Sequence, residues 1–108
     1  MTKEIHSEQD LKEAVYEQDG YVLMNVRAGW CRPCQVMRPT FESTEQAFEG
    51  KIKLCSLDVN EQEDLAERFR APGIPTYILF RDGQEIGRIV GYRQKEKFFA
   101  LLKEFLEK

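Results

Sequence analysis

The chain has 108 residues, of which 42% are hydrophobic and 32% are charged, and its formal net charge at pH 7 is −3. This balance is typical of one soluble globular domain, residues 1–108, and argues against a disordered or membrane-embedded chain. Because the 16 basic residues are spread along the chain rather than gathered into a stripe, we do not expect nucleic acid as a partner.

Turn and breaker residues divide the chain into alternating short elements. In the first half of the chain we expect a strand at 3–6, a helix from Ser7 to the Asp19-Gly20 stop, a strand at 21–26, and a helix from Cys34 to Gly50 that Pro39 kinks. In the second half we expect a strand at 51–59, a helix at 61–70, and a hairpin of strands 76–80 and 85–90 joined at Asp82-Gly83. The chain then ends in a helix with Phe98, Leu102, Phe105 and Leu106 on one face. This order, βαβαβα and then ββα, predicts an α/β domain. We expect a central mixed sheet of about five strands with about four helices on its two faces.

The N-terminal stretch MTKEIHSEQDLKEAV lacks the apolar block of a secretory signal, so we expect a cytoplasmic protein without a membrane partner. In that compartment a CxxC pair is more often redox-catalytic or metal-binding than structural. The single histidine, His6, excludes a site with two histidine ligands, and we expect it to be a partly exposed strand residue. A metal or iron–sulfur site on one CxxC would need a dimer, so we expect no metal.

The segment Trp30-Cys31-Arg32-Pro33-Cys34 places two cysteines three positions apart at the start of a helix. At this spacing the α-carbons lie roughly 5 to 6 Å apart, which permits a disulfide without backbone strain. Unpaired N–H groups and the positive end of the helix dipole favour a thiolate at Cys31, so we expect Cys31 to be the attacking nucleophile. Cys34, one turn inside and better shielded, is expected to resolve the mixed disulfide. Pro33 fits the first turn, where its missing N–H costs little.

Tryptophan before CxPC, Pro39, the loop Gly73-Ile74-Pro75-Thr76, the Asp82-Gly83 hairpin and Gly91 stand in the order of the thioredoxin family. The chain resembles that family over essentially its whole length. A lone CxxC is a weak signal, but a GIPT loop about forty residues later in this strand order makes it a strong one. The resemblance implies a thioredoxin fold and a monomeric protein-disulfide reductase. It further implies no cofactor, disulfide-containing protein substrates and a thioredoxin-reductase-like electron donor.

The resemblance also implies roles for the residues around the dithiol. Pro75 would follow a cis peptide bond and face the dithiol. The docking surface would be bordered by Trp30, Gly73, Ile74, Gly91 and Tyr92, and the backbone of Ile74 would pair with an extended substrate segment. The alternative for Trp30 is a core aromatic, but its place beside a surface dithiol favours a contact role.

Four positions depart from the family pattern. Arg32 replaces a usual glycine, Asn25 a buried aspartate, Arg27 a common tryptophan, and Ser56 a lysine near that aspartate. The first three changes favour the Cys31 thiolate and the fourth opposes it, so a combined shift of about one pK unit is expected. We therefore expect a reduction potential less negative than the value of about −270 mV known for thioredoxin.

Three alternatives remain open from the sequence. In the first, Asn25 has a chemical effect: its amide cannot accept a proton, so Cys34 would resolve the mixed disulfide more slowly. The other interpretation is that Asn25 and Ser56 simply hydrogen-bond in the core. Arg32 tunes the sulfur, is a neutral surface residue, or steers acidic partners to the site. The protein is an oxidoreductase, or an adaptor whose docking surface works without redox turnover. Cys55, inside a buried-strand pattern, is expected to pack rather than to react.

Overall fold

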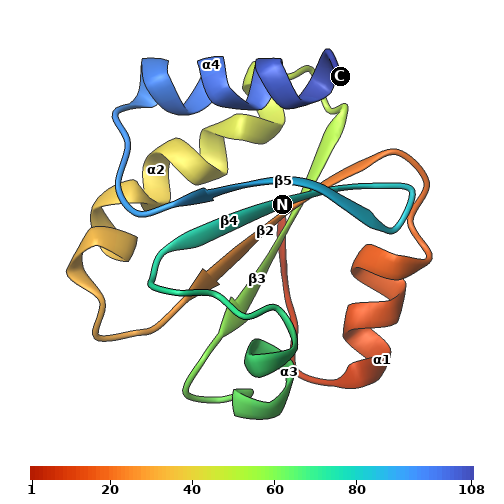
Figure 1. The fold of residues 1–108 in the computed structure, drawn as a ribbon, viewed down its shortest axis with the longest axis vertical. Coiled ribbons are helices and arrows are strands. Elements are labelled where there is room, and N and C mark those ends of the chain that lie inside the picture. Colours follow the sequence, from red (N-terminus) through yellow and green to blue (C-terminus); the bar gives the residue numbers. More distant parts are fainter.

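The computed structural model describes all 108 residues (Figure 1). The elements are β1 (Thr2–Glu4), α1 (Glu8–Leu11), the π-helical segment η1 (Lys12–Tyr16), β2 (Tyr21–Arg27), α2 (Arg32–Ala47), β3 (Ile52–Asp58), α3 (Glu63–Arg68), β4 (Thr76–Arg81), β5 (Gln84–Val90) and α4 (Lys95–Leu106). Their order confirms the predicted βαβαβα–ββα arrangement and the α/β class. No helix is both long enough and apolar enough to cross a membrane.

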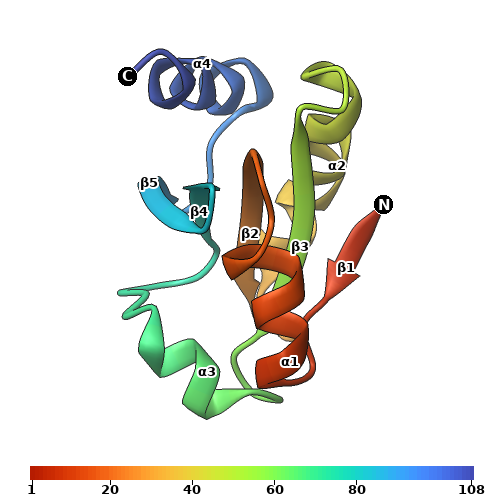
Figure 2. The same ribbon diagram turned by 90° about the vertical axis from the view of Figure 1, so that its right-hand side faces the viewer.

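The five strands form one mixed sheet in the order β1-β3-β2-β4-β5. Strands β1, β3 and β2 run parallel, β4 is antiparallel to β2, and β5 is antiparallel to β4. Figure 1 shows α2 and α4 on one side of the sheet and α1 and α3 on the other, and Figure 2 shows the strands in the order β5, β4, β2, β3, β1 from left to right. The central strand β2 is buried over most of its length, as its continuous β-prone sequence predicted.

Helices cover both faces of the sheet and create two core layers. On one face, side chains of α1, η1 and α3 pack against alternate residues of β2, β3 and β4; this layer contains Leu11, Val15, Leu65, Phe69, Met24 and Ile78. On the other face α2 and α4 do the same, and this layer contains Met37, Phe41, Phe98, Leu102, Leu23 and Tyr77. The period-2 alternation of side chains thus divides the apolar residues of each strand between the two layers.

Local signals explain the ends of several elements. The Ser7 hydroxyl accepts a hydrogen bond from the backbone N–H of Asp10, the predicted cap of the first helix. The Asp82-Gly83 turn has both residues at positive φ, 50° and 83°, as a tight hairpin requires. A Cβ added to Gly83 would lie 2.5 Å from the carbonyl oxygen of Tyr16, so this position accepts only glycine without movement of the backbone.

The central strand leads directly into the cysteine motif. Strand β2 ends at Arg27, and α2 begins at Arg32, two residues earlier than the sequence predicted, because Cys31 acts as the N-cap. The side-chain amide of Gln35 donates to the carbonyl oxygen of Gly29 at 2.9 Å and ties the connecting loop to the first turn of α2. The fold therefore places both cysteines where a buried parallel strand meets a helix N-terminus.

Candidate active site

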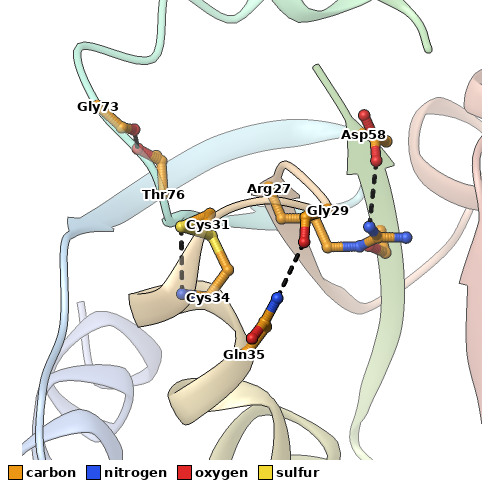
Figure 3. The surroundings of a disulfide bond; sticks show 9 residues. Arg27, Gly29, Cys31, Cys34, Gln35, Asp58, Gly73 and Thr76 are labelled. Carbon is orange, nitrogen blue, oxygen red and sulfur yellow. Dashed lines mark hydrogen bonds and ion pairs between the residues drawn. A yellow bond between two sulfur atoms is a disulfide. The ribbon is translucent and has the colours of Figure 1, made fainter. Parts of the chain in front are cut away.

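Cys31 and Cys34 form a disulfide in the first turn of α2 (Figure 3). Their α-carbons lie 5.3 Å apart, inside the range that disulfides prefer. The backbone N–H of Cys34 donates to Cys31 Sγ at 3.2 Å. The predicted proximity of a helix N–H group to Cys31 is therefore confirmed, and this donor favours negative charge on the Cys31 sulfur over the Cys34 sulfur.

The two cysteines do not differ in burial. Cys31 is 3% exposed and Cys34 is 4% exposed, so the expectation that Cys34 is better shielded is wrong for the disulfide form. The reason is packing, because both sulfur-bearing side chains cluster with Ala28 and are covered by Val59 and Ile74. The two sulfurs are distinguished by their hydrogen bonding and not by their accessibility.

Two loops that are distant in sequence meet beside the dithiol. The Ile74–Pro75 peptide bond is cis, as the resemblance implied, and Ile74 packs against the two cysteines. The Thr76 hydroxyl donates to the carbonyl oxygen of Gly73 at 2.5 Å (Figure 3). The backbone N–H of Gly91 donates to the carbonyl oxygen of Pro75 at 2.7 Å. These bonds join the start of β4 and the end of β5 into one rim.

Large apolar side chains are exposed on the segments that border the dithiol. Trp30 is 70% exposed and Tyr92 is 50% exposed, so Trp30 is not a core aromatic. Gly73 is exposed, and Ile74 and Gly91 are half-buried. The structure thus brings the predicted docking residues to one region, while their role in docking stays a prediction.

Arg27 and Arg32 lie in different electrostatic environments. The Arg27 guanidinium pairs with Glu4 at 2.7 Å and with Asp58 at 3.3 Å, and its Nε donates to Ser56 Oγ at 2.7 Å. Figure 3 shows it reaching toward Asp58 and away from Cys31. Because two carboxylates neutralise Arg27, we expect it to affect Cys31 less than the sequence suggested. Arg32 is exposed and has no carboxylate within ion-pair distance, so of these two arginines Arg32 is the one whose charge is not neutralised.

Asn25 and Ser56 are neighbours across β2 and β3 and are 4% and 2% exposed. Ser56 is hydrogen-bonded to Arg27, as a packing role requires, whereas Asn25 Oδ1 has no hydrogen-bond partner. Both residues line a cavity of about 470 Å³ between α2 and the β1 edge of the sheet, together with Phe41. Core hydrogen bonding therefore accounts for Ser56 and does not account for Asn25.

Tyr77, the cross-strand partner of Asn25 on β4, is a residue that the sequence analysis did not single out. Its side chain is fully buried, and the ring packs against Phe41 and Phe98 at centroid distances of 5.7 and 4.9 Å. The hydroxyl has no hydrogen-bond partner, and burial raises the pKa of Tyr77 above its ordinary range. Tyr77 lay inside an apolar strand run, where only its hydroxyl sets it apart from the core residues around it.

Cys55 is a buried, free cysteine in the core layer formed with α1 and α3. Burial, with a smaller effect of the Glu4 charge, raises the pKa of the Cys55 thiol far above its ordinary range. The predicted packing role is confirmed, because a protonated thiol without solvent access is unreactive.

The raised pKa of Cys55 predicts a loss of stability at alkaline pH. With the disulfide intact, Cys55 is the only thiol that titrates, and it ionises more easily in the unfolded chain than in the folded one. The free energy of unfolding should therefore be unaffected below the ordinary thiol pKa of about 8.5 and fall above it. Urea unfolding at several pH values should show the natural protein losing about 1.4 kcal/mol more per pH unit than Cys55→Ala above about pH 9. Stability curves of the two proteins that stay parallel above about pH 9 would refute this. Tyr77 is present in both proteins, so its own titration contributes equally to the two curves.

Comparisons with known proteins agree with this geometry. The family model described as Thioredoxin matches residues 2–104. Thioredoxins of Staphylococcus aureus, strains Mu50 and N315, are each 35% identical over 89 residues, which cover 82% of this chain and 86% of theirs.

Two solved structures also resemble this chain. The thioredoxin of Malassezia sympodialis, a member of a pan-allergen family, has a TM-score of 0.85 at 27% identity and covers 97% of this chain and 90% of its own. A chain from work on thiol resolution in a yeast mitochondrial 1-Cys peroxiredoxin has a TM-score of 0.83 at 25% identity. This match covers 99% of this chain and 95% of the other. With the cysteine pair at the start of α2 and the cis-proline loop beside it, these matches show that the chain belongs to the thioredoxin family.

Proposed function

We propose that this protein reduces disulfides in other proteins by exchanging them with the Cys31–Cys34 dithiol. The observation that carries the proposal is the bonded cysteine pair at the N-terminus of α2, in a chain of the thioredoxin family. The hydrogen bond from Cys34 N–H to Cys31 Sγ supports Cys31 as the nucleophile.

The exchange has two steps. In the first, the Cys31 thiolate bonds to one sulfur of the substrate disulfide, that disulfide breaks, and the second substrate sulfur leaves as a thiolate. In the second, Cys34 loses its proton and attacks Cys31 Sγ, which re-forms the Cys31–Cys34 disulfide and releases the first substrate sulfur. The substrate gains two electrons, which an external dithiol or a thioredoxin-reductase-like protein must restore to this protein. We place this cycle in the cytoplasm and in a monomer.

The residues around the dithiol support a less reducing protein than thioredoxin. Arg32 adds an unpaired positive charge within the motif, and Asn25 stands where the family usually has a carboxylate. Both changes favour the Cys31 thiolate and so stabilise the reduced form. Because Arg27 is already paired with Glu4 and Asp58, the expected change in potential depends mainly on Arg32 and Asn25.

The alternative is an adaptor that uses the same docking surface without redox turnover. The unpartnered Asn25 in place of an aspartate favours it, and the intact cysteine pair argues against it.

Catalysed reduction of insulin by dithiothreitol tests the proposal. The natural protein should accelerate insulin precipitation well beyond dithiothreitol alone, and equilibration with glutathione should give a potential less negative than about −270 mV. An adaptor would leave the dithiothreitol rate unchanged. A potential at or below that value would reject the tuning and keep the reductase activity.

A further inference from the structure

The arginines divide into paired and unpaired groups. Arg27, Arg38, Arg68, Arg81 and Arg88 each lie within ion-pair distance of a carboxylate. Arg32, Arg70 and Arg93 do not. Each of these three lies in or next to a segment that borders the dithiol. Arg32 is in the cysteine motif, Arg70 precedes the Gly73–Pro75 loop, and Arg93 follows the Gly91–Tyr92 rim. The unpaired arginines are therefore close in sequence to the segments that border the reactive sulfurs.

Arg93 is held in place although no carboxylate binds it. Its Nη1 donates to the carbonyl oxygens of Val90 at 3.0 Å and Tyr92 at 2.8 Å, and its backbone N–H contacts Met37 Sδ at 3.5 Å. These bonds fix the guanidinium beside Gly91 and leave Nε and Nη2 without a partner. A positioned guanidinium with free donors is suited to bind a carboxylate.

Arg32 is exposed at the start of α2, whose first turn contains no acidic residue. Hydrogen bonding between Gly91 and Pro75 and the packing of Ile74 on the cysteines connect its surroundings to those of Arg93. Arg32 and Arg93 therefore belong to segments that are connected to each other through the loop beside the dithiol.

The third unpaired arginine lies in a different environment. Arg70 lines a groove of about 500 Å³ beside α3, and Glu63 and Glu67 line the same groove. These carboxylates offset its charge. Arg32 and Arg93 thus remain as the arginines in the segments around the dithiol that have no carboxylate partner, on a chain whose net charge is −3.

We propose that the surface around the dithiol selects acidic substrates, with carboxylate side chains next to the reactive cysteine of the substrate binding Arg32 and Arg93. The inference rests on the proposed function, because the partner is the disulfide substrate itself. An acidic substrate gains a charge-assisted contact at each of these two arginines, so their charges guide the encounter toward the dithiol.

Two disulfide peptides that differ only in charge test the proposal. Each contains one internal disulfide, flanked by aspartates in the first peptide and by lysines in the second, and each is mixed with the reduced protein in a single turnover. We expect the acidic peptide to react about tenfold faster at an ionic strength of about 0.01 M and the preference to disappear near 0.5 M, where screening is strong.

Arginine variants separate docking from sulfur chemistry. Arg32→Gln and Arg93→Gln should each lower the ratio of acidic to basic rates about threefold, and the double variant should abolish the preference. Since both peptides meet the same sulfur, a changed thiolate cancels in this ratio. Arg81→Gln, paired with Asp82 at the remote hairpin, is the matched control and should keep the natural ratio.

The outcomes distinguish the two proposals. Equal rates at low salt, a preference for the basic peptide, or a ratio that survives in the double variant would overturn the selection of acidic substrates while leaving exchange intact. If the natural protein reduces neither peptide, the proposed function itself fails.

Discussion

Replacing Cys34 with serine should stop turnover and trap the protein on its substrate. Cys31 keeps its hydrogen bond in this variant, because the donor is the backbone N–H of residue 34 and not its side chain. Attack on a substrate disulfide therefore proceeds, but a serine hydroxyl cannot close the second disulfide. Insulin reduction should fall to the rate of dithiothreitol alone. When the pre-reduced variant is mixed with insulin without dithiothreitol, non-reducing electrophoresis should show a covalent adduct that added dithiothreitol cleaves.

The reciprocal variant decides which sulfur attacks. Cys31→Ser should form no adduct and show no activity, and Cys55→Ala should behave as the natural protein because Cys55 is fully buried. An adduct that forms at Cys34 in Cys31→Ser would reverse the assignment. This experiment is needed because the two cysteines are equally buried, and only the hydrogen bond to Cys31 Sγ distinguishes them.

Elements with strong local signals were predictable from the sequence. The Ser7 cap, the continuous β-prone run at 21–26 and the Asp82-Gly83 turn each depend on a few neighbouring residues, and each is present in the structure. The switch from α1 to the π-helical segment at Lys12–Tyr16 has no such signal and was missed. Strand β1 occupies residues 2–4 rather than 3–6, because its pairing with β3 sets its limits.

The site shows the same division. The spacing in WCRPC indicated the disulfide, and the GIPT loop indicated the cis peptide bond through its resemblance to the family. The pairing of Arg27 with Glu4 and Asp58 joins residues 23 and 31 positions apart and exists only once β1, β2 and β3 are assembled. Net electrostatic effects on Cys31 therefore could not be summed from the sequence.

Replacing Asn25 with aspartate should shorten the lifetime of the mixed disulfide about a hundredfold, within the range that a positioned general base contributes. The new carboxyl replaces a side chain of similar size whose Oδ1 has no partner, and it lies beside the cavity under α2, the helix that carries Cys34. Unlike the amide, a carboxylate can accept the Cys34 proton directly or through one water. Its negative charge also disfavours the Cys31 thiolate, so the reduction potential should become more negative.

The pH dependence separates this base from a packing effect. Burial raises the pKa of the introduced carboxyl above its ordinary value of about 3.9, so the unfolded chain ionises first as the pH rises. Asn25→Asp should match the natural protein in stability at acid pH and become less stable above about pH 4, while resolution accelerates as the buried carboxyl ionises.

Rapid quenching with a disulfide peptide measures the lifetime of the mixed disulfide. Asn25→Leu, which fills the site without a base, should leave this lifetime unchanged. An unchanged lifetime and potential in Asn25→Asp would make residue 25 a packing residue, and the proton of Cys34 would then have to leave by a route that avoids this cavity.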